Sequence, residues 1–159
     1  MTQRIPMTPE GHEKLRVELK HLKEVVRHRV IRDIEEARAH GDISENSEYE
    51  DAKERQAHCE GRIRELEGRL SLADVIDITK VKPTAAVMFG TTVLLEDTDS
   101  GEESTYRIVG AEDVDVKAGM VSFSSPIGRA LIGRKKGDEV RFETPKGTRT
   151  VVINDVLYK

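Results

Sequence analysis

The chain has 159 residues, of which 35% are charged and only 4% aromatic. This composition is thin for one large hydrophobic core and favours long exposed helices joined to a small globular domain. The formal net charge of −4 excludes a globally basic surface, so any contact with nucleic acid must come from a local patch. The single cysteine, Cys59, excludes an intrachain disulfide. We find no pattern of a signal peptide or membrane span, and therefore expect a cytoplasmic protein with no membrane partner.

A first long helix is predicted from Pro9 to His40. Thr8 suits the N-cap and Pro9 the first helical position, while Gly41 suits a left-handed C-terminal cap. At about 1.5 Å per residue this helix is roughly 48 Å long. Its apolar residues recur at steps of 4, 3, 4, 4, 4 and 3, one helix face with a local drift from strict heptads: Leu15, Leu19, Leu22, Val26, Val30, Ile34 and Ala37.

A second helix is predicted from Tyr49 to Ala73, with a heptad seam along its whole length. Gly61 and Gly68 lie off this seam and each cost the helix roughly 1 kcal/mol relative to alanine. Two such stripes joined by a short loop predict an antiparallel hairpin, thinner near the loop, where the seam residues are small or polar. The seam consists of Tyr49, Ala52, Gln56, Cys59, Ile63, Leu66, Leu70 and Ala73.

The pattern changes after Ala73 to short alternating segments separated by turn signals. A short helix from Pro126 to Ile132, capped by Ser125, interrupts them. We predict an α+β protein with a coiled-coil hairpin at 1–79 and a small antiparallel sheet domain with one short helix at 80–159. The expected strands are Val75–Thr79, Ala86–Phe89, Thr91–Glu96, Thr105–Val109, Met120–Phe123, Glu139–Glu143 and Thr148–Val156.

The loop of the hairpin carries two carboxylates three positions apart, Asp42 and Glu45. One interpretation is a capping box, in which Asp42 accepts backbone N–H groups and Glu45 reaches back. The other is a site for a hard cation. Magnesium needs about six oxygen ligands, so two side chains cannot complete its shell and a partner must supply the rest. The spacing alone leaves both interpretations open.

The loop sequence Gly-Asp-Ile-Ser-Glu-Asn-Ser-Glu-Tyr (41–49) closely resembles the bacterial Gre transcript cleavage factors. Further matching blocks follow in order along nearly the whole chain: Ile5-Pro6-Met7-Thr8, Glu36-Ala37-Arg38, Cys59-Glu60-Gly61-Arg62-Ile63, Val75-Ile76-Asp77, Thr105 to Gly110, Ser125-Pro126-Ile127 and Ala130 to Gly133. Many blocks in one order make the resemblance far more specific than the acidic pair alone.

The resemblance implies an antiparallel coiled coil followed by an FKBP-like domain. It implies a monomer that binds RNA polymerase: the second domain docks at the secondary channel and the coiled coil enters it. There the acidic tip helps the polymerase hold a second Mg²⁺ beside backtracked nascent RNA, so that the polymerase cleaves its own transcript. On this basis the chain is not an enzyme by itself, and Mg²⁺ is shared with the polymerase active site.

Carried over by position, Asp42 and Glu45 are the catalytic, metal-assisting pair. Arg38, Lys53 and Arg55 are candidate RNA-binding residues near the tip; for each of them alone, a solvated helix face is the simpler interpretation. The resemblance also assigns polymerase binding to Ser125, Pro126 and Ile127, for which helix capping and core packing are the simpler roles.

Two other functions stay open. A protein of the same shape can enter the channel and regulate or inhibit transcription without cleavage, although the intact Asp42 and Glu45 argue against this. A structural coiled-coil adaptor unrelated to polymerase would leave the match at the loop unexplained.

Overall fold

The computed structural model describes residues 3–40 and 47–159. The chain forms two compact units, which we describe separately. The helical unit comprises Met1–Ile5 and His12–Ala73, and the sheet unit comprises Pro6–Gly11 and Asp74–Lys159. The predicted fold class, a helical hairpin followed by a sheet domain with a short helix, is confirmed.

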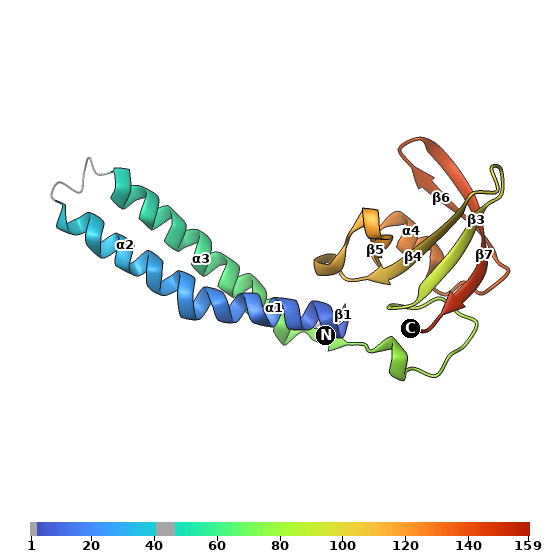
Figure 1. Cartoon of the computed structure of the whole chain (residues 1–159), viewed down its shortest axis with the longest axis horizontal. Helices are drawn as coiled ribbons and strands as arrows, with labels where there is room; N and C mark the ends of the chain where they lie inside the picture. The colour runs from blue at the N-terminus through green and yellow to red at the C-terminus, as the bar shows by residue number, and fades with distance from the viewer. Residues whose placement is uncertain (1–2, 41–46) are drawn as a thin grey trace. The chain divides into compact units, whose positions relative to one another are not determined.

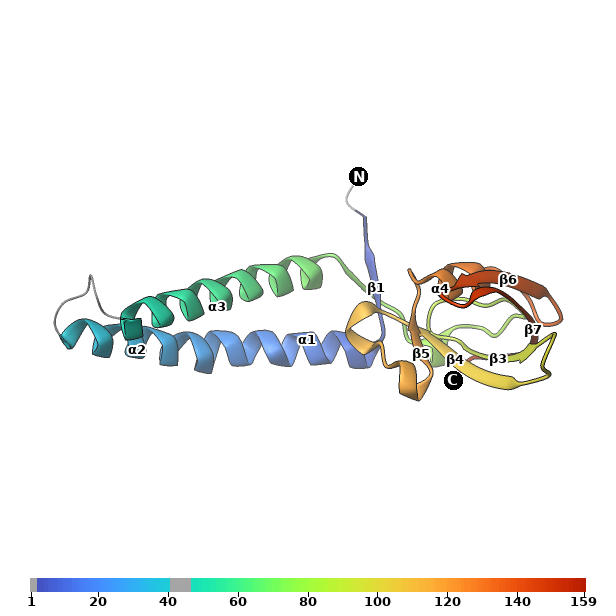
Figure 2. The ribbon, with the colours of Figure 1, turned by 90° about the horizontal axis from the view of Figure 1, so that it is seen from above.

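The hairpin is built from two helical arms. The first consists of α1 (Pro9–His21), the π-helical turn η1 (Leu22–Val26) and α2 (Arg27–Ala39), which follow one another without a break. The second arm is α3 (Ser47–Ser71), which lies antiparallel beside α2 (Figures 1 and 2). Both predicted helices are confirmed within two residues at each described end. Thr8 caps the first arm as predicted, since its Oγ1 accepts a hydrogen bond of 2.9 Å from the Gly11 backbone N–H.

The π-helical turn accounts for the drift in the first apolar stripe. Leu22, Val26, Val30 and Ile34 follow each other at steps of four, which exceed one α-helical turn and would rotate the stripe away from its partner. A π-turn, closed by the hydrogen bond from the Arg27 N–H to the Leu22 carbonyl, contains more residues per turn and keeps the stripe facing α3. The spacing of the apolar residues in the sequence indicated a departure from strict heptads, but it did not indicate where the π-helical turn would form.

The hairpin core follows the predicted seam. Toward the loop end, Val30 and Ile34 of α2 and Ala52 of α3 form a separate small cluster, against which Val26 and Tyr49 pack. Cys59 is only 5% exposed, and burial raises the pKa of its thiol, which suits a packing residue. The buried set of the hairpin is Leu15, Val30, Ile34, Ala37, Ala52, Cys59, Ile63 and Leu66.

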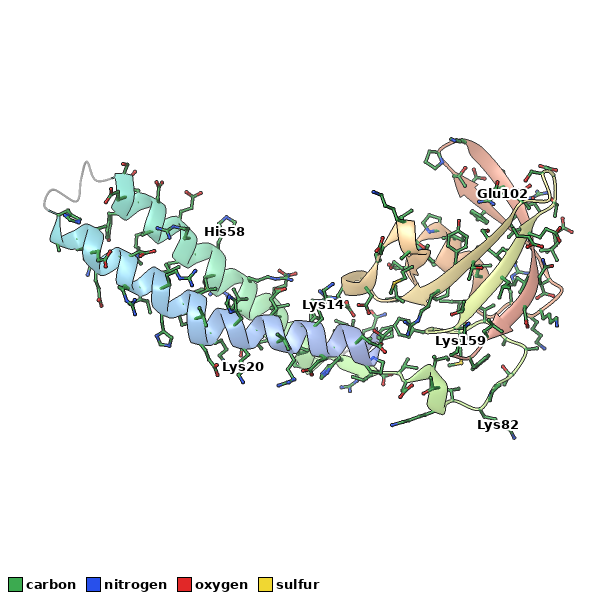
Figure 3. The ribbon with its side chains drawn as sticks, viewed as in Figure 1. Lys14, Lys20, His58, Lys82, Glu102 and Lys159 are labelled. Atoms are coloured by element: carbon green, nitrogen blue, oxygen red, sulfur yellow. The ribbon has the colours of Figure 1, made fainter. Side chains whose placement is uncertain are left out.

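Ion pairs connect the arms outside this apolar seam. These pairs occur at intervals along the hairpin. Other polar side chains, such as Lys20 and His58, point outward from it (Figure 3). Surface pairs of this kind each stabilise a protein by only about 0–1 kcal/mol. The cross-hairpin pairs are Glu18–Arg62 at 2.7 Å, Lys23–Glu67 at 4.0 Å, Arg27–Glu60 at 3.0 Å and Asp33–Arg55 at 2.9 Å.

The sheet unit contains a five-stranded sheet in the order β5-β4-β3-β7-β6. All neighbours are antiparallel except β4 and β5, which run parallel. The sheet is therefore mixed, and the prediction of a wholly antiparallel sheet was wrong for this one pair. The helix α4 (Pro126–Leu131) lies between β5 and β6 in sequence. The strands are β3 (Thr92–Asp97), β4 (Glu103–Val109), β5 (Met120–Ser122), β6 (Glu139–Thr144) and β7 (Gly147–Leu157).

Five of the predicted strands correspond to these, and two predictions were wrong. Residues 86–89 form only an isolated bridge, Ala86 to Lys135, because the chain turns at Gly90 before β3 begins. Residues 75–79 contain the end of the short strand β2 (Ala73–Val75) and the start of a 3₁₀ turn at Ile78–Lys80. The partner of β2 is β1 (Ile5–Met7), a strand too short to leave a sequence signal.

A hydrophobic core lies against one face of the five-stranded sheet. Alternate residues of β3, β6 and β7 point to the same face, where Leu131 of α4 is completely buried among them. The buried members are Val87, Val93, Leu95, Ile108, Val121, Leu131, Val140, Phe142, Val151 and Ile153.

Candidate functional site

The end of the hairpin is where α2 stops and α3 starts. The helix α2 ends at Ala39, and the cap residue His40 donates its backbone N–H to the Ala37 carbonyl at 3.3 Å. The chain is described again from Ser47, the first residue of α3. The predicted metal-assisting pair, Asp42 and Glu45, lies outside the described residues, as does the predicted cap Gly41, so their roles remain predictions.

The three predicted RNA-binding residues are all exposed near this end, and each contacts a different partner. The guanidinium of Arg38 lies over the ring of Tyr49, 5.8 Å from its centroid, a cation–π contact between the arms. Arg55 forms its ion pair with Asp33 on α2. Lys53 donates a hydrogen bond of 3.1 Å to Gln56 within α3. Since residues two apart on a helix do not face the same way, Lys53 and Arg55 present their charges in different directions.

A shallow groove lies between the arms beside these residues, with a cavity volume of about 330 Å³. Four carboxylates line it, so its lining is predominantly acidic despite the presence of Arg55. Sequence reasoning missed this groove because its members are brought together only by the register of α2 against α3. The lining residues are Asp33, Glu36, Ala37, His40, Glu48, Asp51 and Arg55.

In the part of the chain that the structure describes, no group of three His, Cys, Asp or Glu side chains is placed to hold a metal ion. The donor chemistry of Asp42 and Glu45, two carboxylates, suits Mg²⁺, which prefers oxygen ligands. Two carboxylates fall short of a complete shell, which suits a cation that a partner also binds.

The predicted polymerase-binding residues lie at the start of α4. Ser125 caps the helix: its Oγ accepts the Gly128 N–H at 3.1 Å and donates to the Ser122 carbonyl at 2.6 Å. Pro126 occupies the first turn and is exposed, whereas Ile127 packs partly against the core of the sheet. The capping and packing roles are therefore confirmed, and an interface role for these residues remains a prediction.

Across residues 3–40 and 47–159, no helix is long and apolar enough to cross a membrane.

Comparison with known proteins identifies the family. Residues 5–75 match the family model for the N-terminal part of transcription elongation factors, and residues 82–158 match the model for the C-terminal part of the GreA and GreB elongation factors. The chain therefore belongs to the GreA/GreB family of transcription elongation factors.

Within that family it is similar to proteins named transcription elongation factor GreA. Those of Methylococcus capsulatus and Hyphomonas neptunium are each 52% identical to it, covering 96% and 99% of this chain and 97% and 99% of their own. That of Psychrobacter cryohalolentis is 50% identical over 98% of this chain and 99% of its own. A crystal structure of GreA factor homolog 1 from Thermus thermophilus is 29% identical, covers 97% of this chain and 99% of its own, and overlays with a TM-score of 0.45.

Proposed function

We propose that this chain binds RNA polymerase during elongation, places the end of its hairpin in the secondary channel and stimulates the polymerase to cleave backtracked RNA. The observation that carries the proposal is the pair Asp42 and Glu45, in the short segment between the two arms of a long hairpin, in a chain of the GreA/GreB family. From His12 to Ala39 the first arm extends roughly 42 Å at about 1.5 Å per residue, a length suited to a recessed target.

Asp42 and Glu45 would hold Mg²⁺ jointly with polymerase and RNA ligands. The cation that this pair would help to hold would complete a two-metal site, in which one ion would generate the attacking water and the other would stabilise the leaving oxygen of the transcript. The carboxylates of Asp42 and Glu45 supply the negative charge that makes cation binding favourable at that point. Because two carboxylates do not complete the shell, binding depends on the polymerase, and the chain by itself has no nuclease activity.

The remaining residues would position this pair. Ser125, Pro126 and Ile127 are the proposed contact of the sheet domain (80–159) with polymerase, with Pro126 the exposed member. Arg38, Lys53 and Arg55 are the proposed contacts to the RNA backbone near its 3′ end. The coiled-coil domain (1–79) would act as a monomeric, cytoplasmic arm with no membrane contact.

A cleavage assay on a stalled, backtracked elongation complex with Mg²⁺ tests the proposal. We expect wild type to release short 3′ RNA fragments, and Asp42→Asn with Glu45→Gln to bind polymerase without releasing them. The isosteric changes keep much of any capping role, and circular dichroism of the free variant checks that the hairpin is folded. As a control for lost negative charge, Glu48→Gln with Asp51→Asn neutralises two carboxylates of the acidic groove and should not abolish cleavage.

The outcomes separate the alternatives. Polymerase binding by wild type without fragments would favour a channel-binding regulator or inhibitor. Loss of binding or of helix content in the Asp42 and Glu45 variant would instead assign this pair to capping. No binding of wild type to polymerase would contradict the proposal altogether.

A further inference from the structure

We infer that Asp33 is a positioning residue that holds Arg55 away from RNA, so that Arg55 contacts the transcript only when this ion pair opens. The inference rests on the proposed function and adds a built-in restraint on one of its RNA-contacting residues. The ion pair between Asp33 and Arg55 is a contact between the two arms that the sequence did not reveal.

The ion pair joins the arms close to the hairpin end. Nη1 of Arg55 on α3 lies 2.9 Å from Oδ2 of Asp33 on α2. The side chain of Arg55 is 53% exposed and that of Asp33 is 33% exposed. A pair this open to water has a small net stability, because screening offsets most of the Coulomb attraction. Arg55 can therefore exchange partners when a phosphate approaches.

The charges around Arg55 strengthen the restraint. Glu36, Glu48 and Asp51 line the same groove as Asp33 and Arg55. The positive charge of the Arg55 guanidinium is attracted to these carboxylates, which favours its position in the groove. The same carboxylates repel an RNA phosphate that approaches the groove. Lys53 differs, since the side chain it contacts, Gln56, is neutral. We therefore expect neutralisation of Asp33 to increase RNA contact by Arg55 and not by Lys53.

A purely structural role is the competing explanation, because other ion pairs also connect the arms. Arg27 and Glu60 form one such pair, with Nη2 and Oε1 3.0 Å apart and side chains 34% and 37% exposed. It is likewise a partly exposed guanidinium–carboxylate pair, although its arginine is less exposed than Arg55, and it lies further from the loop. Glu60→Gln is thus a matched control for the loss of one cross-hairpin ion pair.

The test uses full-length protein and a backtracked elongation complex whose RNA carries a photo-crosslinkable nucleotide at its 3′ end. Four proteins are compared: wild type, Asp33→Asn, Asp33→Asn with Arg55→Gln, and Glu60→Gln. Crosslink yield and the concentration for half-maximal cleavage are measured over a series of salt concentrations. Thermal unfolding followed by circular dichroism reports the structural cost of each change.

If Asp33 restrains Arg55, Asp33→Asn lowers the half-maximal concentration by about twofold to fivefold, the equivalent of one partly exposed ion pair. Its crosslinking also becomes more salt-dependent, with a logarithmic slope steeper by about 0.7 for one additional contact to a single-stranded phosphate. Adding Arg55→Gln removes both effects, and Glu60→Gln shows neither. The maximal cleavage rate stays unchanged, because Asp33 does not touch the reacting atoms.

Three results would overturn the inference. Unchanged RNA contact in Asp33→Asn would mean that Arg55 stays in the groove or does not bind RNA. Persistence of the gain in the double variant would mean that Arg55 is not its cause. An equal gain in Glu60→Gln would assign the effect to a looser hairpin. In each of these cases, cleavage by the wild-type protein would still support the proposed function. If the wild-type protein gave no cleavage, both the proposed function and the restraint of Arg55 by Asp33 would lose their basis.

Discussion

Arg62 of α3 donates two parallel hydrogen bonds to the carboxylate of Glu18 on α1, from Nε to Oε2 at 2.7 Å and from Nη2 to Oε1 at 3.0 Å. Paired hydrogen bonds between guanidinium and carboxylate are stronger and more directional than single ones. The contact joins the arms in the part of the hairpin that lies away from the loop, and it lowers the pKa of Glu18 below its ordinary value of 4.5.

Glu18→Gln should therefore destabilise the hairpin, by about 0.5 kcal/mol once screening of these partly exposed groups is allowed for. Because the folded state lowers the pKa of Glu18, the stabilisation is present above pH 4.5 and disappears as the pH falls through the lowered value. Urea unfolding followed at 222 nm, at neutral pH and near pH 3, measures this difference. A difference between the two proteins that stays constant with pH would show that the ion pair is not its source.

Gly61 and Gly68 occupy interior positions of α3, and a Cβ added to either residue would have no atom within 4 Å. Replacing either with alanine reduces the backbone freedom of the unfolded chain without a clash, so each change should stabilise the hairpin by about 0.5–1 kcal/mol. A rise in the thermal midpoint of the helical signal checks this.

Gly128 is the contrasting control in α4. A Cβ there would clash with the backbone carbonyl oxygen of Ser122, so Gly128→Ala should destabilise the sheet unit by about 1–3 kcal/mol. A loss of stability in Gly68→Ala would contradict the prediction for α3, because it would mean that the added methyl group meets a neighbouring atom at this position.

Asp97 and Arg149 connect β3 to β7 through a contact of 2.8 Å. The hydrogen bond from Arg149, together with those from the backbone N–H groups of Ser100 and Asp99, lowers the pKa of Asp97 from 3.8 to about 2. Its stabilisation of the sheet unit should be complete above pH 3.8 and be lost as the pH falls through about 2. Asp97→Asn should speed amide exchange in β3 and β7 at neutral pH and leave exchange in α3 unchanged, as measured by NMR. Equal acceleration in both units would contradict this local role.

Ser125→Ala should cost about 1 kcal/mol by removing the cap of α4. Ser125→Asn retains capping, because asparagine is as favourable at that position, but presents a different surface. If the residue also binds polymerase, both variants bind polymerase more weakly while only Ser125→Ala loses stability. If only Ser125→Ala bound polymerase more weakly, in line with its lower stability, Ser125 would have a capping role alone. Ser124→Ala, at the exposed neighbour, is the control.

Local patterns in the sequence predicted the helices and most strands, because burial of one face imposes a period on the residues that form it. The caps at Thr8 and Ser125 were equally readable, since the hydrogen bonds of a cap lie within three residues. The same periodicity located Asp42 and Glu45 between the two predicted helices, and the resemblance at 41–49 implied their metal-assisting role, which stays a prediction.

Tertiary structure decided what depends on register between segments far apart in the chain. The parallel pairing of β5 with β4 and the pairing of β1 with β2 have no local signal, because the pattern within one strand does not say which strand lies beside it. The π-turn at Leu22–Val26 forms because the stripe must keep facing α3. The same register places Asp33 against Arg55, and so determines which of the basic residues near the hairpin end has a carboxylate partner across the hairpin.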